Sequence, residues 1–168
     1  MQTIEELLTS YASYHRDPRN KATHFIGVPL IVYALFIPLG WFRFRYPELL
    51  PVPLTAATVF CAAIFVYYLY LDSLIALLQA PILLVLLYLA DKTSLLDLAP
   101  SASIFAAAFI GGWMIQFIGH YFEGKRPALF DNILQIFNAP LFLAMEVAFV
   151  LGLRSDLKAK IEQALAPG

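Results

Sequence analysis

Apolar residues run along most of the chain in stretches long enough to cross a membrane, and polar residues gather between them. A spanning helix needs about 20 mostly apolar residues, with a range of roughly 17–25. Five stretches meet or approach this length, and they lie at 25–42, 54–71, 74–90, 103–122 and 133–153. The pattern predicts an all-α integral membrane bundle of four to five transmembrane helices, formed by residues 1–168 as a single domain.

The second and third stretches are separated only by Asp72 and Ser73. A single helix through both would hold about 37 residues and extend roughly 55 Å, which exceeds the roughly 30 Å hydrocarbon core of a bilayer. We therefore expect a tight hairpin at these two residues. Pro81 and Pro140 lie inside the third and fifth stretches, and we expect kinks or irregular turns there because proline lacks the backbone N–H.

Amphipathic segments flank the apolar stretches at both ends of the chain. Residues 4–15 place apolar side chains at helical spacing, and the C-terminal segment RSDLKAKIEQALA does the same. Both patterns predict helices that lie on the membrane or cap the bundle. Asp17 followed by Pro18 is typical of a helix start, so we expect the first membrane helix to begin near Pro18.

The composition supports a membrane protein and excludes several other classes. Hydrophobic residues make up 61% of the chain and charged residues 14%, with a mean hydropathy of +0.74, whereas soluble domains carry about 45–50% apolar and about 25% charged residues. The net charge of −1 gives no basic surface for nucleic acid. The single cysteine, Cys61, leaves no disulfide framework and no cysteine-based metal site. We therefore expect a protein of the lipid bilayer with no nucleic-acid partner.

The three histidines of the chain are placed so that they meet at one side of the membrane. His15 and His24 lie before and at the start of the first apolar stretch, and His120 lies near the end of the fourth. Four crossings return the chain to its starting side, so all three imidazoles are expected at the same interface. A fifth crossing would leave the C-terminus on the opposite side.

This placement favours a metal site. Neutral imidazole is the commonest metal ligand and suits iron, zinc and copper, and a catalytic site keeps about three protein ligands with open positions for substrate. Gln116 and Glu123 lie on the same helical face as His120. A single histidine at a membrane interface is more often structural, but three together beside polar residues indicate a site of His15, His24 and His120.

Several charged residues near this interface have two open interpretations. The basic side chains could anchor lipid headgroups, or an arginine could bind a substrate carboxylate through two parallel hydrogen bonds. Glu146 could hydrogen-bond inside the bundle or pair with a group of the site. Asp72 is expected to be a turn residue. The candidates for substrate binding at this interface are Arg16, Arg19, Asn20, Gln116 and Arg126.

The segments YHRDPRNKATHFIGVP and QFIGHYFEGKRPAL, in this order and about a hundred residues apart, resemble the family of 2-hydroxy-fatty-acid dioxygenases, which are small polytopic membrane proteins. The resemblance covers nearly the whole chain. It implies an Fe(II)- and O2-dependent α-oxidation of long-chain 2-hydroxy fatty acids, which releases CO2 and a fatty acid one carbon shorter. It also implies a multi-pass protein of the bacterial inner membrane or the endoplasmic reticulum.

The resemblance also implies roles for individual residues. His15, His24 and His120 match the motif histidines, and we expect them to be the catalytic iron ligands. A 2-hydroxy acid can occupy two positions of an octahedral iron and O2 a third, which leaves three for the protein. This count favours Glu123 as a catalytic residue that orients an imidazole. Were Glu123 instead a fourth ligand, the substrate would have to bind through one oxygen or displace it. No 2-oxoglutarate is expected, because the substrate itself supplies the electrons.

Three other classes of protein compete with this interpretation. Membrane fatty-acid hydroxylases and desaturases carry many more histidines in clustered boxes than the three found here, so that class is nearly excluded. A b-type haem protein or another non-enzymatic metal-binding protein would use two or three of the histidines as ligands. A small carrier or scaffold would need none of them for chemistry.

Overall fold

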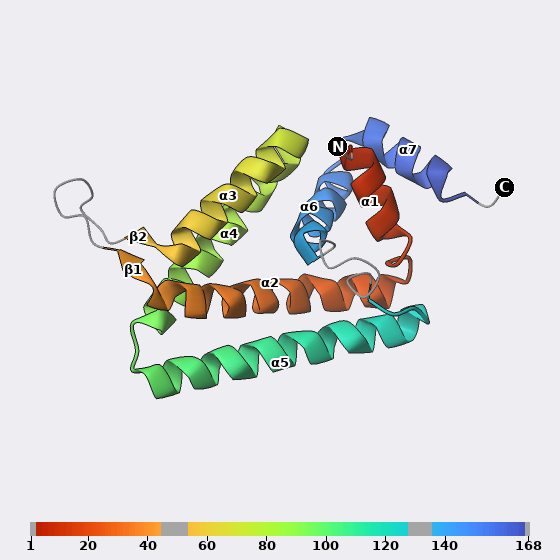
Figure 1. The fold of residues 1–168 in the computed structure, drawn as a ribbon. Helices are drawn as coiled ribbons and strands as arrows, with labels where there is room; N and C mark the ends of the chain where they lie inside the picture. The colour runs from red at the N-terminus through yellow and green to blue at the C-terminus, as the bar shows by residue number, and fades with distance from the viewer. Residues whose placement is uncertain (1–2, 45–53, 128–135, 167–168) are drawn as a thin grey trace.

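Helices dominate the computed structural model, which describes residues 3–44, 54–127 and 136–166. The helices are α1 (Ile4–Ala12), α2 (Pro18–Trp41), α3 (Ala56–Leu71), α4 (Ser73–Ser94), α5 (Leu98–Glu123), α6 (Asn138–Val150) and α7 (Ser155–Ala164). A short antiparallel ribbon of β1 (Arg43–Phe44) and β2 (Leu54–Thr55) follows α2 and was not expected from the sequence. The predicted all-α class is confirmed (Figure 1).

Three helices in the described part of the chain are long and apolar enough to cross a membrane, namely α2, α4 and α5 with 24, 22 and 26 residues. α2 begins at Pro18, as predicted, with the Asp17 side chain accepting a hydrogen bond from the Arg19 backbone N–H. α3 has 16 residues and α6 only 13. Both are apolar but shorter than the three long helices, and the number of four to five crossings stays a prediction.

The fifth predicted span, 133–153, corresponds to α6 and is only partly described. Its described part forms a helix only from Asn138 to Val150, and residues 133–135 lie outside the described residues. Pro140 occupies the first turn, where its missing N–H breaks no helical hydrogen bond, and Gly152 with a φ of 74° lies just beyond the end. The expected kink at Pro140 is therefore replaced by a helix start. α4, by contrast, continues through Pro81.

α2 and α5 lie side by side and antiparallel over most of their length (Figure 1). Glycines of α5 permit this close approach. A Cβ atom at Gly112 would lie 2.7 Å from Ile31 Cγ1, and one at Gly119 would lie 2.5 Å from Asn20 Oδ1 and closer still to Thr23 Oγ1. The backbone of α5 thus touches α2 beside His120, and side chains near this contact are brought together.

The predicted hairpin between α3 and α4 is confirmed and turns at Asp72. The Asp72 Oδ1 atom accepts a hydrogen bond of 3.1 Å from the Ile75 backbone N–H and so caps α4, while Oδ2 pairs with the Arg154 guanidinium. The buried Tyr68 hydroxyl donates to the Phe137 carbonyl at 2.6 Å. Asp72 is a turn residue, and it also ties the hairpin to the segment between α6 and α7.

The two predicted amphipathic helices are present as α1 and α7, and they pack against each other (Figure 1). The Lys160 Nζ atom of α7 lies 3.2 Å from the Glu5 Oε2 atom of α1. The C-terminal helix therefore lies beside the N-terminal one, whereas five full crossings would place it on the opposite side. α1 ends at Ala12, so His15 lies in the connector and not on the helix itself.

Replacing Gly119 with alanine should destabilise the protein by about 1–3 kcal/mol, because the new methyl group overpacks the contact between α5 and α2. The matched change Gly111→Ala meets only Leu30 Cδ2 at 4.0 Å and should leave stability unchanged or raise it by up to about 1 kcal/mol. Thermal unfolding in detergent measures both. Equal melting temperatures for the two variants would contradict the close approach.

Candidate metal centre

The connector between α1 and α2 is held in place by the carboxylate at the end of α5. Glu123 Oε1 accepts a hydrogen bond from the Arg16 backbone N–H at 3.0 Å, and Oε2 accepts one from the Asp17 backbone N–H at 2.8 Å. Oε2 also accepts from the Asn20 side-chain amide at 3.2 Å. Glu123 therefore fixes the backbone immediately after His15 rather than contacting an imidazole by a hydrogen bond.

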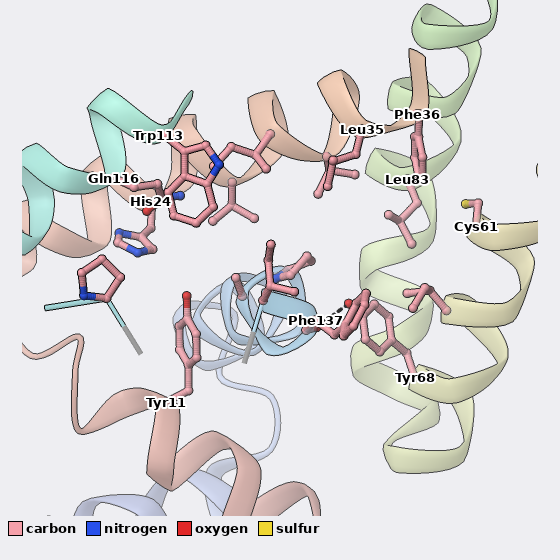
Figure 2. A pocket seen from close by; sticks show the side chains of 18 of the residues that line it. Tyr11, His24, Leu35, Phe36, Cys61, Tyr68, Leu83, Trp113, Gln116 and Phe137 are labelled. Carbon is pink, nitrogen blue, oxygen red and sulfur yellow. Dashed lines mark hydrogen bonds between the residues drawn. The ribbon is translucent and has the colours of Figure 1, made fainter. Parts of the chain in front are cut away.

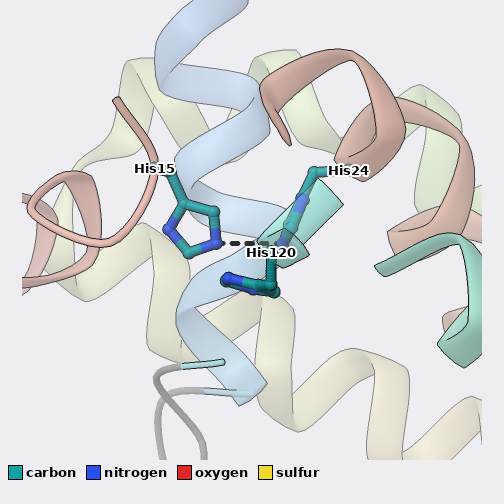
Figure 3. Close-up of side chains that lie close together, drawn as sticks. All are labelled: His15, His24 and His120. Atoms are coloured by element: carbon teal, nitrogen blue, oxygen red, sulfur yellow. Dashed lines mark hydrogen bonds between the residues drawn. The ribbon is translucent and has the colours of Figure 1, made fainter. Parts of the chain in front are cut away.

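The three histidines meet in the interior of the protein, as Figure 3 shows. His15 comes from the connector, His24 from the second turn of α2 and His120 from the last turn of α5. All three are buried, and one ligand nitrogen from each lies within 4.8 Å of the other two. The predicted convergence of the three imidazoles is present in the structure.

The hydrogen bonds of two imidazoles determine where their protons lie. His15 Nδ1 is 2.8 Å from the Tyr11 carbonyl, and His24 Nδ1 is 2.9 Å from the Asn20 carbonyl. A carbonyl only accepts, so both Nδ1 atoms carry the proton and both Nε2 atoms present a lone pair. This is the arrangement commonly found in metal-ligating histidines.

These two lone pairs face each other at 2.9 Å between His15 Nε2 and His24 Nε2 (Figure 3). The contact is favourable only if a cation or an extra proton lies between the two nitrogens. Burial, reinforced by the neighbouring His24, lowers the pKa of His15 to about 2, which opposes the extra proton. Two ligands at right angles on a metal, each at about 2.0–2.1 Å, would lie about 3 Å apart.

Two further buried atoms near the histidines are unpaired. Neither His120 Nδ1 nor Gln116 Oε1 has a hydrogen-bond partner among the described residues. Asn20 Oδ1 is unpaired among them as well. An unpaired buried polar atom is costly, and a ligand bound beside the histidines would offer His120 Nδ1 and Gln116 Oε1 a partner. The donor set of three neutral nitrogens fits a divalent transition metal with open positions.

Tyr11 belongs to the site and was not identified from the sequence as a site residue. Its ring stacks on His15 with centroids 4.1 Å apart and planes 6° apart, and its side chain lines the adjoining cavity. The tyrosine shares a helical face with His15 in the sequence, four residues before it, but this spacing alone is equally typical of a core residue. Stacking and the backbone hydrogen bond together fix the His15 ring.

A cavity of about 240 Å³ opens beside the histidines and extends towards the α3–α4 hairpin (Figure 2). At the end of the cavity beside the histidines the lining is polar and includes Gln116. The rest of the lining is mostly aliphatic and aromatic. None of the described lining residues is charged. The lining comprises Tyr11, His15, His24, Val28, Ile31, Val32, Leu35, Phe36, Phe60, Cys61, Ile64, Tyr68, Leu83, Trp113, Gln116, His120, Pro127, Ile136, Phe137, Ala139 and Pro140.

The predicted arginines lie outside this lining. The Arg19 guanidinium pairs with the Asp17 carboxylate at 2.8 Å and lies 4.4 Å from the Phe122 ring centre. The hydrogen bonds that Asp17 accepts from the side chain and the backbone of Arg19 lower the pKa of Asp17 to about 2. Arg16 borders a separate surface pocket, and Arg126 is exposed. Their assignment to substrate binding stays a prediction.

Asn20 and Glu146 have structural partners. Asn20 is fully buried, and its amide nitrogen donates to Glu123 and to the Tyr14 carbonyl. Glu146 of α6 accepts a hydrogen bond from Lys21 of α2 at 2.7 Å. Of the two interpretations open for Glu146, the structure favours the pair inside the bundle.

The geometry disfavours a haem between two of these histidines. Axial ligands bind from opposite faces of the porphyrin, and at about 2.0–2.1 Å from the iron they would lie about 4 Å apart. His15 Nε2 and His24 Nε2 are only 2.9 Å apart. The rings of these two histidines also lie 5.0 and 5.1 Å from that of His120, which leaves no room for a porphyrin plane among the three.

Comparison with known proteins gives a consistent result. A family model described as "2-hydroxy-palmitic acid dioxygenase Mpo1-like" matches residues 1–151. The chain is 37% identical over 164 residues to the 2-hydroxy-palmitic acid dioxygenase MPO1 of Saccharomyces cerevisiae, and the alignment covers 96% of this chain and 89% of the yeast protein. No solved structure gives a significant match. The match spans both histidine segments, and this chain belongs to the Mpo1-like family of 2-hydroxy-palmitic acid dioxygenases.

Proposed function

We propose that this protein is a membrane-embedded, Fe(II)-dependent dioxygenase that shortens long-chain 2-hydroxy fatty acids by one carbon. The observation that carries the proposal is that His15 Nε2 and His24 Nε2 face each other at 2.9 Å, with both Nδ1 atoms bonded to carbonyls and His120 beside them. The family relationship to a dioxygenase of 2-hydroxy-palmitic acid supports the substrate class. The three long apolar helices support a membrane location.

In this proposal His15, His24 and His120 hold the iron. When bound, Fe(II) supplies positions for the oxygens of the substrate and for O2, together with the one-electron chemistry that O2 requires. Three protein ligands would leave room on the ion for a chelating 2-hydroxy acid and O2. The carbonyls of Tyr11 and Asn20 keep His15 and His24 in the tautomer that presents Nε2.

The reaction balances without another co-substrate. One 2-hydroxy acid and one O2 give the acid one carbon shorter, one CO2 and one water. The bond between C1 and C2 breaks, and the substrate supplies all four electrons that reduce O2. This is why no 2-oxoglutarate is needed.

The remaining residues of the site would position the substrate and keep water away. Gln116 Oε1 is buried, unpaired and next to the histidines, so it is placed to accept the hydrogen bond of the 2-hydroxyl group. The apolar lining takes the acyl tail and excludes water from the reacting end. Glu123 is a positioning residue, because it acts on His15 through the backbone of Arg16 and Asp17.

Each single change His15→Ala, His24→Ala or His120→Ala should abolish stoichiometric iron binding and oxygen uptake with long-chain 2-hydroxy acids. The full-length protein is purified in detergent without oxygen, and iron is measured by elemental analysis. Gln79→Ala serves as the control, because Gln79 is also a buried polar residue but does not line the cavity. Wild-type protein without iron-dependent oxygen uptake would refute the proposed function.

Glu123→Gln should weaken iron binding by about 10–100-fold, the effect typical of groups that orient metal ligands. A neutral amide can accept from the backbone at one atom only, so the connector carrying His15 is released while the three imidazoles remain. Iron affinity is measured by titration under nitrogen, with helix content by circular dichroism as the check on folding. Glu162→Gln, an exposed carboxylate on α7, is the control, and equal iron affinities for both variants would contradict the positioning role.

A further inference from the structure

We propose that Phe36, Cys61 and Leu83 form the end wall of the acyl site and set the length of the chain that the enzyme accepts. This inference rests on the proposed function, because it takes a 2-hydroxy acid bound at the histidines as its starting point. All three side chains line the cavity and are buried, with 3%, 7% and 4% of their surface exposed.

The cavity runs along one face of α2. Its lining takes from that helix His24, Val28, Ile31, Val32, Leu35 and Phe36. These positions recur three and four residues apart, which is the spacing of a single helical face. In Figure 2 Gln116 and His24 lie at one side of the view, and Phe36, Leu83 and Cys61 lie at the other. The histidines and the proposed wall are therefore at opposite ends of one elongated cavity.

The length of this face can be compared with an acyl chain. From His24 to Phe36 the helix rises about 18 Å, at 1.5 Å per residue. Each bond of an extended hydrocarbon advances roughly 1.3 Å, given a carbon–carbon bond of about 1.52 Å. The length of this helix face thus equals that of about 14 carbon–carbon bonds, counted from the carbon that carries the 2-hydroxyl group. An acid of about 16 carbons has this length.

The end wall is held by contacts independent of the metal site. Cys61 belongs to α3 and Leu83 to α4, and these helices pack as a hairpin. Tyr68, which also lines this end, is anchored by its hydrogen bond of 2.6 Å to the Phe137 carbonyl. Because interiors are densely packed and resist compression, a longer chain cannot easily push this wall aside.

Cys61 provides a direct probe of the wall, since it is the single cysteine of the chain. The iron-loaded protein is labelled under nitrogen with methyl methanethiosulfonate, a small neutral thiol reagent, and intact mass reports the rate. Saturating 2-hydroxyhexadecanoic acid should slow labelling at least about tenfold, because its last methylenes cover the thiol. Saturating 2-hydroxyoctanoic acid should leave the rate unchanged. Equal labelling rates with both acids would overturn the proposal.

Substitution at the wall gives the second test. Cys61→Trp should lower kcat/KM for 2-hydroxyhexadecanoic acid by about tenfold or more, since each methylene pushed out of an apolar site costs about fourfold, and should leave 2-hydroxydodecanoic acid nearly unaffected. Val66→Trp is the matched control, because Val66 lies on α3 but is 63% exposed. The length limit would be refuted if Cys61→Trp lowered kcat/KM equally for both acids. It would also be refuted if kcat/KM depended on chain length in the same way in both variants.

The two experiments separate this inference from the proposed function. Chain-length-dependent protection of Cys61 without any oxygen uptake would retain the acyl site and reject the dioxygenase. Oxygen uptake without such protection would retain the dioxygenase and reject the end wall. Both measurements use the full-length protein in detergent.

Discussion

The close contact between α2 and α5 is the constraint on which the rest of the site depends. At Gly119 the backbone of α5 touches Asn20 and Thr23 of α2, so the next residue, His120, is brought beside His24. The same contact places the Glu123 carboxylate where it can hold the connector that carries His15. One helix pair thus determines the positions of all three imidazoles, although only two of them lie on its helices.

The remaining helices pack around the α2–α5 pair. The α3–α4 hairpin leaves α2 at its far end and supplies the apolar wall opposite the histidines (Figures 1 and 2). α6 fills the space between the hairpin and the metal centre, and several of its side chains are buried. α1 contributes Tyr11, whose ring supports His15. Apolar packing and the polar site are therefore parts of the same core.

Much of this arrangement could be predicted from the sequence, because it depends on local signals. The start of α2 at Pro18 and the turn at Asp72 follow from capping residues and the lengths of the apolar stretches. The meeting of the three histidines follows from the order of the helices, because the α3–α4 hairpin turns the chain back so that α5 lies beside α2. The short α6 and the return of the C-terminal helix could not be predicted, because an apolar stretch of sufficient length does not reveal where its helix begins. Two further features depend on tertiary packing, which residue spacing does not encode. They are the contacts of Glu123 with backbone N–H groups and the position of the arginines outside the described cavity lining.

The cavity beside the histidines has no charged residue in the part of its lining that the structure describes. A 2-hydroxy fatty acid, the proposed substrate, would carry a carboxylate into it, and an uncompensated anion is expensive to bury. Among the described residues that line the cavity none carries a positive charge, so in the proposed reaction a bound metal would compensate the carboxylate and would bind before the acid. On the proposed function, metal supply would determine the order of assembly: without iron the cavity suits a neutral chain, and the bound ion would convert it into a receptor for an acid.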